Sequence, residues 1–514
     1  MAQANCYPQA HLVSPMSQFL NRHARLPILF ILAAFPRILM ALFWPNAFGD
    51  AYVYIQEIGT LSTKIASGSF RLIDLFGFWL PFYQLISAQL NLFIKNGFYS
   101  GKIVAGLFGA GACLFVYLLT ERVTNNGKAA LSVFLLIAFN PLHLAYSGSA
   151  MTDIPHAFLV LAALYFAVTG DWIVAAIFGA LAGFTRVESW MLVALLPFIQ
   201  FVKERRISIL PVLILAAPAV FWFYISWKAT GNWLECFVQR QQYHDWLLRM
   251  NPAIAHFSPG NVLKDAATLI VSSDIAVMTA AFAAGGLGIK RWRNSLSHHD
   301  KRNQFSSVLA PLFFFFAFLA LLVGAYLTHQ QPIIFPRYGL ILFALGLPVL
   351  AWTLLEIRKR DPRRWRLALT ATIALLAIDA TVQCVGTVGS LNQYRAQRAA
   401  ADYLRDHFDR NSGARIFCDD GTVRVLSGIP PDKFVDSNTA PKDRQHFLKF
   451  LDDSDVDYLV LIEAERSTPF ELFGAVPDQG SIGDYTPVAK SRTRFIYTAI
   501  QIFSRSKSTS LPAH

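Results

Sequence analysis

The chain has 514 residues, of which 54% are hydrophobic and 15% are charged. Its apolar residues form runs of about 20, the length of a helix that crosses a hydrocarbon core ~30 Å thick. The 45 Lys and Arg residues exceed the 33 Asp and Glu residues, for a net charge of +12. Because the basic residues cluster between apolar runs, they fit the cytoplasmic loops of a membrane protein and give no reason to expect a nucleic-acid partner. The composition predicts a multi-pass protein of a plasma or inner membrane, surrounded by lipid.

Twelve apolar runs follow one another, but the charge pattern does not fit twelve crossings. The runs begin near Pro27, Phe76, Ile103, Ala129, Ile154, Trp172, Ser189, Ile209, Ala266, Ser306, Tyr338 and Leu367. If all of them crossed, the basic residues at 203–206 and 358–366 would face outward, against the positive-inside rule. The run at 76–94 contains Pro81 and the Trp and Tyr residues typical of the membrane interface. With that run at the interface, about eleven crossings remain, the N-terminus is cytoplasmic and the C-terminus lies outside.

This topology places four segments on the outer side of the membrane, at residues 46–100, 147–153, 228–261 and 328–337. From Asn392 onward the hydropathy falls, and helix-like and strand-like patterns alternate. They are QYRAQRAAADYLRDHF, ARIFCDD, APKDRQHFLKFLDD and VDYLVLIE. We therefore expect an all-α transmembrane domain over residues 1–390 and a small α/β extracytoplasmic domain over residues 391–514.

The most informative residue is Asp50, which follows the first apolar run in ALFWPNAFGDAYVYIQ. A carboxylate is costly inside a bilayer and ordinary well outside it. At the boundary, Asp50 is either merely solvated or placed to act on a lipid-borne group. Arg37 lies inside the same apolar run, where an arginine is costly unless it snorkels or pairs. It either snorkels to the interface or approaches an anionic lipid group.

Other charged residues of the outer segments have both a structural and a functional interpretation. Asp153, in SGSAMTDIPHAF, begins a predicted crossing as a helix cap does, or it takes part in chemistry. Arg186 and Glu188, in TRVES, share an outer turn, where a structural ion pair is the favoured interpretation. Arg337 stands beside Tyr338 and either anchors the chain at the interface or binds an anionic headgroup.

A metal site is the less favoured alternative. His156 follows Asp153 by three residues on one helix face, so the two could share a divalent cation with Asp50 or Glu57. No ligand motif of known spacing accompanies them, and the five cysteines contain no CxxC. The sequence therefore predicts no particular cofactor.

Five segments occur in a characteristic order along the chain. They are Asp50 with Tyr54 and residues 59–68, then LPFYQL, SGSAMTDIPHAF, GALAGFTRVESWMLVALLPF and FPRYGLILFALGLPVLA. In order and spacing they resemble the GT-C membrane glycosyltransferases, in particular the group of dolichyl-phosphate-mannose protein mannosyltransferases and aminoarabinose transferases. The resemblance covers residues 27–351. It implies a GT-C-like fold, a polyprenyl-phosphate sugar donor and transfer on the outer leaflet to an acceptor that the sequence does not identify.

The resemblance also assigns residues by position. Asp50 matches the first-loop acidic residue that lies beside the acceptor, and Asp153 matches the second outer-loop aspartate. Arg337 and Tyr338 match the late outer-loop PRY. Many members carry a second acidic residue directly after the first, whereas this chain has Ala51, so an adjacent pair of carboxylates is not present here.

The chemistry of sugar transfer asks for the same residue types. A carboxylate that takes the proton of the acceptor hydroxyl contributes about 10²- to 10⁴-fold, and Asp50 fits that role. The departing lipid phosphate gains charge that a guanidinium binds well, and Arg337 fits that role. The other residues expected at the substrate site are Tyr338, Arg37, Tyr54, Arg186, Glu188 and His156.

Two other classes of function are compatible with the sequence. A transporter or lipid flippase would place ionisable groups near the middle of the bilayer on broken helices. A catalytically silent membrane scaffold would use the outer α/β domain to bind glycans. An outer cavity where Asp50 and Arg337 converge favours the transferase, and a central path open to both sides favours transport.

Overall fold

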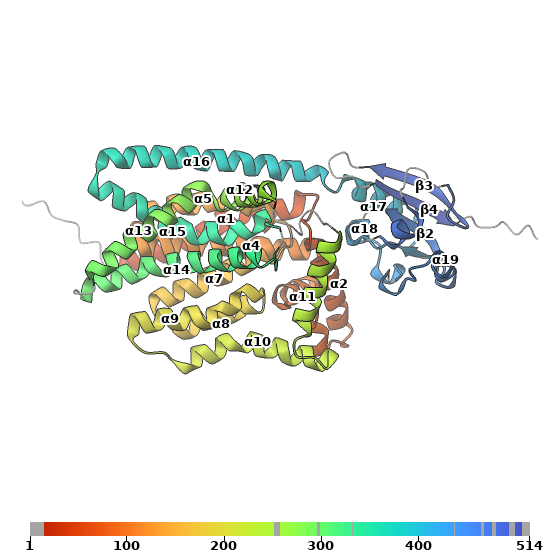
Figure 1. Cartoon of the computed structure of the whole chain (residues 1–514), viewed down its shortest axis with the longest axis horizontal. Coiled ribbons are helices and arrows are strands. Elements are labelled where there is room, and N and C mark those ends of the chain that lie inside the picture. Colours follow the sequence, from red (N-terminus) through yellow and green to blue (C-terminus); the bar gives the residue numbers. More distant parts are fainter. Residues whose placement is uncertain are drawn as a thin grey trace, which may run out of the picture.

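The computed structural model describes residues 15–250, 258–295, 299–331, 333–435, 437–463, 467–474, 480–492 and 499–505. Those residues form a long helical bundle with a small α/β domain at one end (Figure 1). Two helices lie across the bundle at this same end, α2 (Ala51–Ala66) and α11 (Glu235–Met250), and α3 (Phe82–Ile94) packs against α2. They separate the bundle from the α/β domain, and the fold is that of a helical membrane protein.

Six helices of the described chain are long and apolar enough to cross a membrane by themselves. They lie in α1 (Pro15–Phe43), α4 (Gly97–Thr124), α10 (Ile209–Thr230), α14 (His299–Leu327), α15 (Gly339–Arg360) and α16 (Pro362–Gly389). Two bent pairs bring the number to eight if each counts as one span. The pairs are α5 (Gly127–Ala138) with α6 (Pro141–Ser147), and α12 (Pro259–Ser273) with α13 (Ile275–Ser295).

Three more of the expected crossings are shorter helices. They are α7 (Asp153–Thr169), α8 (Trp172–Gly183) and α9 (Leu192–Glu204), with 17, 12 and 13 residues. Helices therefore occupy all eleven expected runs in the described chain, but a total of eleven crossings stays a prediction. The run expected at the interface, residues 76–94, follows the short helix η1 (Leu72–Leu75) and begins with a loop, and its α3 has 13 residues. At 1.5 Å per residue, α3 is about 20 Å long, too short to cross the hydrocarbon core.

The apolar run from Ala266 is not one continuous helix, contrary to the expectation from hydropathy. The chain turns by 87° between α12 and α13, and Asp274 at the break has φ +70°. The Asp274 carboxylate accepts a hydrogen bond from the backbone N–H of Ala276 at 2.9 Å. Asp379 of α16 accepts one from Ile275 at 2.7 Å. These carboxylates satisfy the free N–H groups at the start of α13, so a new helix begins there.

Close packing in the bundle centres on α4, which contacts α1, α5, α7 and α15. Small residues permit this approach. A Cβ atom at Gly109 would lie 2.3 Å from the Ser147 hydroxyl, and one at Gly111 would lie 2.5 Å from the Phe158 ring. Helices in a membrane associate through such small-residue contacts, because lipid tails remove the hydrophobic driving force between them.

The α/β domain contains a four-stranded sheet in the order β1-β2-β4-β3. Its strands are β1 (Arg415–Phe417), β2 (Val456–Ile462), β3 (Tyr485–Arg492) and β4 (Ala499–Arg505). β1 and β2 are parallel, and the other two pairings are antiparallel. Its helices are α17 (Arg395–His407), α18 (Gly421–Ser427), α19 (Arg444–Asp453) and α20 (Thr468–Phe473). The two helices and two strands expected in this region are all present.

The α/β domain contacts the segment that leads to Asp50. The backbone N–H of Gly49 donates to the Tyr394 hydroxyl at 2.9 Å. The Asn46 side chain donates to the carbonyl of Ser390 at 2.9 Å. Gln56 on α2 donates to the Gly421 carbonyl at 3.4 Å, where α18 begins. The chain is therefore bonded to the α/β domain on both sides of Asp50, in the loop before it and on α2 after it.

The positive-inside argument predicts that both α3 and the α/β domain face outward. The turn after α9 and the turn between α15 and α16 carry basic residues and lie at the opposite end of the bundle (Figure 1). In a chain whose own cysteines are replaced, single cysteines at Asn96 and Ser454 should react with an impermeant thiol reagent added to intact cells. A cysteine at Arg360 is the control and should stay unlabelled. Labelling at Arg360 together with protection at Asn96 or Ser454 would reverse this topology.

Candidate active site

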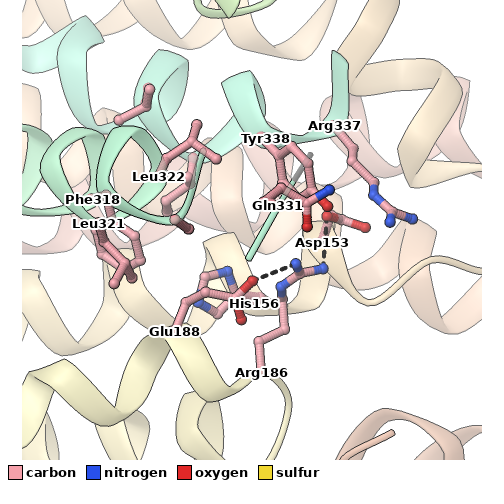
Figure 2. Close-up of a pocket in the computed structure, with 13 residues that line it drawn as sticks. Asp153, His156, Arg186, Glu188, Phe318, Leu321, Leu322, Gln331, Arg337 and Tyr338 are labelled. Carbon is pink, nitrogen blue, oxygen red and sulfur yellow. Dashed lines mark hydrogen bonds and ion pairs between the residues drawn. The ribbon is translucent and has the colours of Figure 1, made fainter. Parts of the chain in front are cut away.

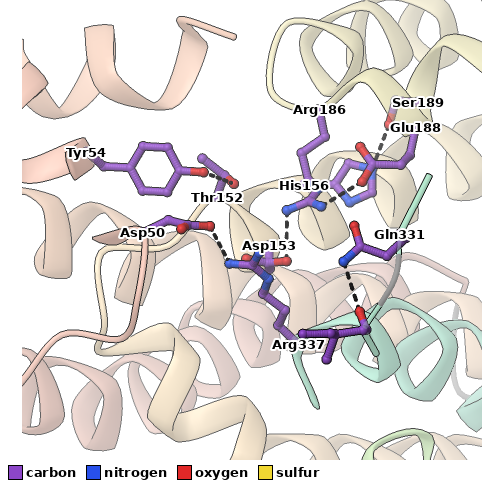
Figure 3. Close-up of polar contacts among 11 residues, drawn as sticks. Asp50, Tyr54, Thr152, Asp153, His156, Arg186, Glu188, Ser189, Gln331 and Arg337 are labelled. Atoms are coloured by element: carbon purple, nitrogen blue, oxygen red, sulfur yellow. Dashed lines mark hydrogen bonds and ion pairs between the residues drawn. The ribbon is translucent and has the colours of Figure 1, made fainter. Parts of the chain in front are cut away.

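Asp50 and Arg337 form an ion pair, although 287 residues separate them in the chain. Asp50 is the residue directly before α2, and Arg337 lies in the short helix η4 (Pro336–Tyr338) that leads into α15. The Arg337 Nη1 donates to Asp50 Oδ2 at 2.7 Å. The side chain of Asp50 is 30% exposed and that of Arg337 is 15% exposed. The base and the phosphate contact expected from the sequence thus lie side by side (Figure 3).

A second charged group lies beside this pair. Arg186 Nη1 donates to Asp153 Oδ1 at 2.9 Å, and its Nη2 donates to Glu188 Oε1 at 2.6 Å. Arg186 precedes the short helix η2 (Val187–Met191), and Asp153 is the first residue of α7. The Arg186–Glu188 pair expected from the sequence is present. Asp153 forms an ion pair instead of a cap, and its Oδ2 has no hydrogen-bond partner among the described residues.

Neutral side chains connect the two charged groups to the surrounding helices. The Tyr54 hydroxyl on α2 and the Thr152 hydroxyl share a hydrogen bond of 3.4 Å. His156 Nε2 and the Ser189 hydroxyl are hydrogen-bonded at 2.7 Å. Tyr54 and His156 are both buried. Each is therefore held in place next to a charged residue of the site (Figure 3).

The electrostatics of the second group are set by its central arginine. Burial opposes ionisation of Glu188, but the charge and the hydrogen bond of Arg186 outweigh burial and lower the pKa of Glu188 to about 2. Burial likewise opposes the charge of Arg186, and Glu188 with Asp153 overcomes it and raises the pKa of the guanidinium. Both groups therefore stay charged across the physiological range of pH.

A cavity opens between these charges and two transmembrane helices. It encloses about 630 Å³ including its open mouth. One end is polar, with Asp153, His156, Arg186, Glu188, Gln331, Arg337 and Tyr338. The other end is apolar and is lined by α14 and α15, through Phe318, Leu321, Leu322, Ala325, Ile341 and Leu342. Figure 2 shows the charged groups gathered at one end of the lining and the Phe and Leu side chains at the other.

Arg37 does not reach this cavity. Its guanidinium is fully buried in the bundle and donates to the carbonyls of Ala33, Ile137 and Ala138 at 2.8 to 3.2 Å. It also contacts His143 Nδ1 at 2.8 Å. The carbonyls of Ile137 and Ala138 lie at the end of α5, where the helix breaks before α6. Arg37 thus neither snorkels nor approaches a lipid phosphate, and it satisfies the carbonyls of a broken helix instead.

Sequence reasoning did not identify Arg240. It lies on α11, and its guanidinium is 5.4 Å from the centre of the Phe78 ring. Burial lowers the pKa of Arg240, while Glu188 raises it and Arg186 lowers it further. Arg240 forms no ion pair in the part of the chain that the structure describes. Its position in the outer segment 228–261 was the available signal, but hydropathy alone does not show that α11 lies across the site.

The described residues contain no cluster of three or more His, Cys, Asp or Glu side chains able to hold a metal ion. Asp153 is paired with Arg186, and His156 with Ser189.

The arrangement of helices is GT-C-like, the fold expected from the sequence. No protein-family model and no curated protein sequence matches the chain. Among solved structures, ArnT from Cupriavidus metallidurans, bound to undecaprenyl phosphate, superposes with a TM-score of 0.53 at 13% identity over 95% of this chain and 98% of ArnT. The Archaeoglobus fulgidus oligosaccharyltransferase, tethered to an acceptor peptide, gives 0.50 at 14% identity over 94% of this chain and 74% of that enzyme.

Proposed function

We propose that this chain is a membrane glycosyltransferase that moves a sugar from a polyprenyl-phosphate carrier to an acceptor at the outer face of the membrane. The cavity beside Arg337 carries this proposal. Its apolar walls on α14 and α15 suit an isoprenoid tail, and its polar end holds Arg186 and Arg337. A ligand that is apolar at one end and anionic at the other matches both parts, and a polyprenyl phosphate has this composition.

The ion pair between Asp50 and Arg337 suggests how donor binding prepares the site. A guanidinium can bind the phosphate of the donor bidentately, as it binds a carboxylate. When the phosphate binds Arg337, Asp50 loses its ion-pair partner. The Asp50 carboxylate then becomes available to the acceptor hydroxyl, so the general base is released only when the donor is in place.

The transfer step follows from these positions. The acceptor oxygen forms a bond to the anomeric carbon of the sugar while Asp50 takes the hydroxyl proton. The bond from that carbon to the phosphate oxygen breaks, and the electron pair leaves with the polyprenyl phosphate. Arg337 stabilises the charge that develops on this leaving group. Arg186 holds Asp153 and Glu188 beside it through ion pairs, and Arg240 adds a further positive charge near Glu188.

The comparison with ArnT supports the choice of ligand, because that structure was obtained with undecaprenyl phosphate and has nearly the same extent. The location of the charges also favours a transferase over a transporter. Asp50, Asp153, Arg186 and Arg337 lie together (Figure 3), in segments that the charge pattern predicts to face outward, whereas a transporter binds its substrate near the middle of the membrane.

The proposal is tested by following a labelled sugar. The purified chain in lipid nanodiscs is mixed with polyprenyl-phosphate mannose or polyprenyl-phosphate aminoarabinose, and a membrane extract supplies the acceptor. We expect the label to leave the donor and polyprenyl phosphate to accumulate, with Asp50→Asn protein as the inactive control. If both donors stay intact with folded parent protein, the proposal fails. Movement of intact donor between the leaflets of a vesicle would identify a flippase instead.

A further inference from the structure

A second pocket lies on the outer side of the bundle, between α2, η1 and α3. It encloses about 650 Å³ including its open mouth. Its polar lining consists of Gln56, Glu57, Thr60, Lys64, Asp74 and Gln84, and its apolar lining includes Phe76 and Trp79. It shares no lining residue with the cavity beside Arg337. The proposed transfer reaction gives none of these side chains a role.

Two polar side chains of this lining are joined by a hydrogen bond, and one of them keeps an atom without a partner. Gln84 is 2% exposed, and its Nε2 donates to Glu57 Oε2 at 3.1 Å. The Gln84 Oε1 has no hydrogen-bond partner among the described residues. Burial raises the pKa of Glu57 to about 7, against the opposing effect of the Gln84 hydrogen bond. A buried carbonyl without a partner and a carboxyl at this pKa are costly to fold, so a ligand that bonds to them would offset part of that cost.

The charged side chains of the lining disfavour a phosphate as the ligand. Lys64 is the one cation in the lining, and its ammonium already forms an ion pair with Asp74 at 2.8 Å. Glu57 adds negative charge when it is ionised. A neutral ligand that both donates and accepts hydrogen bonds fits this lining better than an anion does.

The aromatic lining adds a flat apolar surface. Trp79 packs edge-to-face against Tyr54, with ring centroids 5.2 Å apart, and against Phe78 at 4.6 Å. These contacts fix the indole ring in place at the pocket. An immobilised aromatic face beside a carboxyl and a carboxamide provides an apolar surface for C–H groups together with partners for hydroxyl groups.

We propose that the pocket between α2 and α3 is a carbohydrate subsite, in which a sugar ring stacks on Trp79 and its hydroxyls bond to Glu57 and Gln84. This assignment rests on the proposed transfer reaction. In that reaction the subsite holds the acceptor, which is therefore a carbohydrate or a molecule that carries one. Asp50 directly precedes α2 and Glu57 follows two helical turns later, a rise of about 10 Å. Tyr54 contacts Trp79 and lies between them on α2. A saccharide bound at Glu57 can therefore present its next unit to Asp50.

Direct binding of free saccharides tests this subsite. The full chain is placed in nanodiscs free of glycoside detergent, and a panel of mono- and disaccharides of mannose, glucose, galactose and N-acetylglucosamine is screened by saturation-transfer NMR. We expect at least one saccharide to bind. Glu57→Leu and Trp79→Leu should each weaken its binding by tenfold or more, while Glu57→Gln, which keeps the hydrogen bonds, should lose less. The control is Thr63→Val, an exposed residue of α2 outside the pocket.

Binding of polyprenyl phosphate, measured on the same samples, reports whether each variant is folded and separates the two proposals. Loss of saccharide binding with retained lipid binding supports the subsite. A saccharide that binds the parent and both leucine variants equally, or a panel in which none binds, overturns it. If the sugar competes with a polyprenyl-phosphate sugar, the pocket holds the sugar of the donor and not the acceptor. If saccharide binds but polyprenyl phosphate does not, the subsite stands and the transfer reaction fails.

Discussion

Asp50→Asn is expected to abolish sugar transfer while the protein stays folded. Asparagine keeps the shape of the side chain and an oxygen that accepts from Arg337, but it cannot take a proton from the acceptor. Loss of a general base costs about 10²- to 10⁴-fold in rate. The rate of release of polyprenyl phosphate from a labelled donor measures the effect. Transfer at the parental rate by the variant would remove Asp50 from the mechanism.

The same variant has a second expected result that a merely structural role would not produce. Asp50 and the donor phosphate are expected to compete for Arg337, since Arg337 Nη1 donates to Asp50 Oδ2 at 2.7 Å. Asp50→Asn removes the charge of the competitor, so polyprenyl phosphate should bind more tightly as transfer is lost. Asp153→Asn is the matched comparison, because Asp153 pairs with Arg186 instead. It should reduce transfer less, and an equal loss in both variants would make Asp153 part of the catalytic pair.

Arg337→Ala is expected to weaken the binding of polyprenyl phosphate more than any other single change in the cavity. A lost hydrogen bond to a charged group costs about 1.5 to 3 kcal/mol, which corresponds to a dissociation constant about 10 to 150 times larger. Arg337→Lys keeps the charge but not the planar fork of donors, so its effect should be smaller yet clear. The measurement is binding of polyprenyl phosphate to the purified protein in nanodiscs.

Arg358→Ala provides a control for the loss of one positive charge, because Arg358 lies near the end of α15 that is far from the cavity. It should bind the lipid as the parent does. If Arg337→Ala also binds it as tightly as the parent, Arg337 is only the partner of Asp50 and an interfacial anchor. Arg186 and Arg240 then become the residues to test for the phosphate contact.

The class of the protein and many of its elements follow from local patterns in the sequence. Runs of about 20 apolar residues predict membrane helices because hydropathy is a property of each segment alone. Pro81 and the aromatic residues of the run at 76–94 predict an interfacial segment, and the structure contains only a short helix there. The alternation of patterns after Asn392 likewise predicted the helices and strands of the α/β domain. Asp50 and Arg337 could be singled out because charged residues are few near a membrane boundary.

What hydropathy could not predict is which distant side chains meet. The Asp50–Arg337 pair joins two outer loops that only the packing of the bundle brings together. Asp153 had the sequence features of a helix cap, yet tertiary packing gives it Arg186 as a partner. Arg37 is directed to the carbonyls at the break after α5 for the same reason. The energy of a buried charge depends on the groups that surround it in space, and those groups are fixed by the tertiary structure.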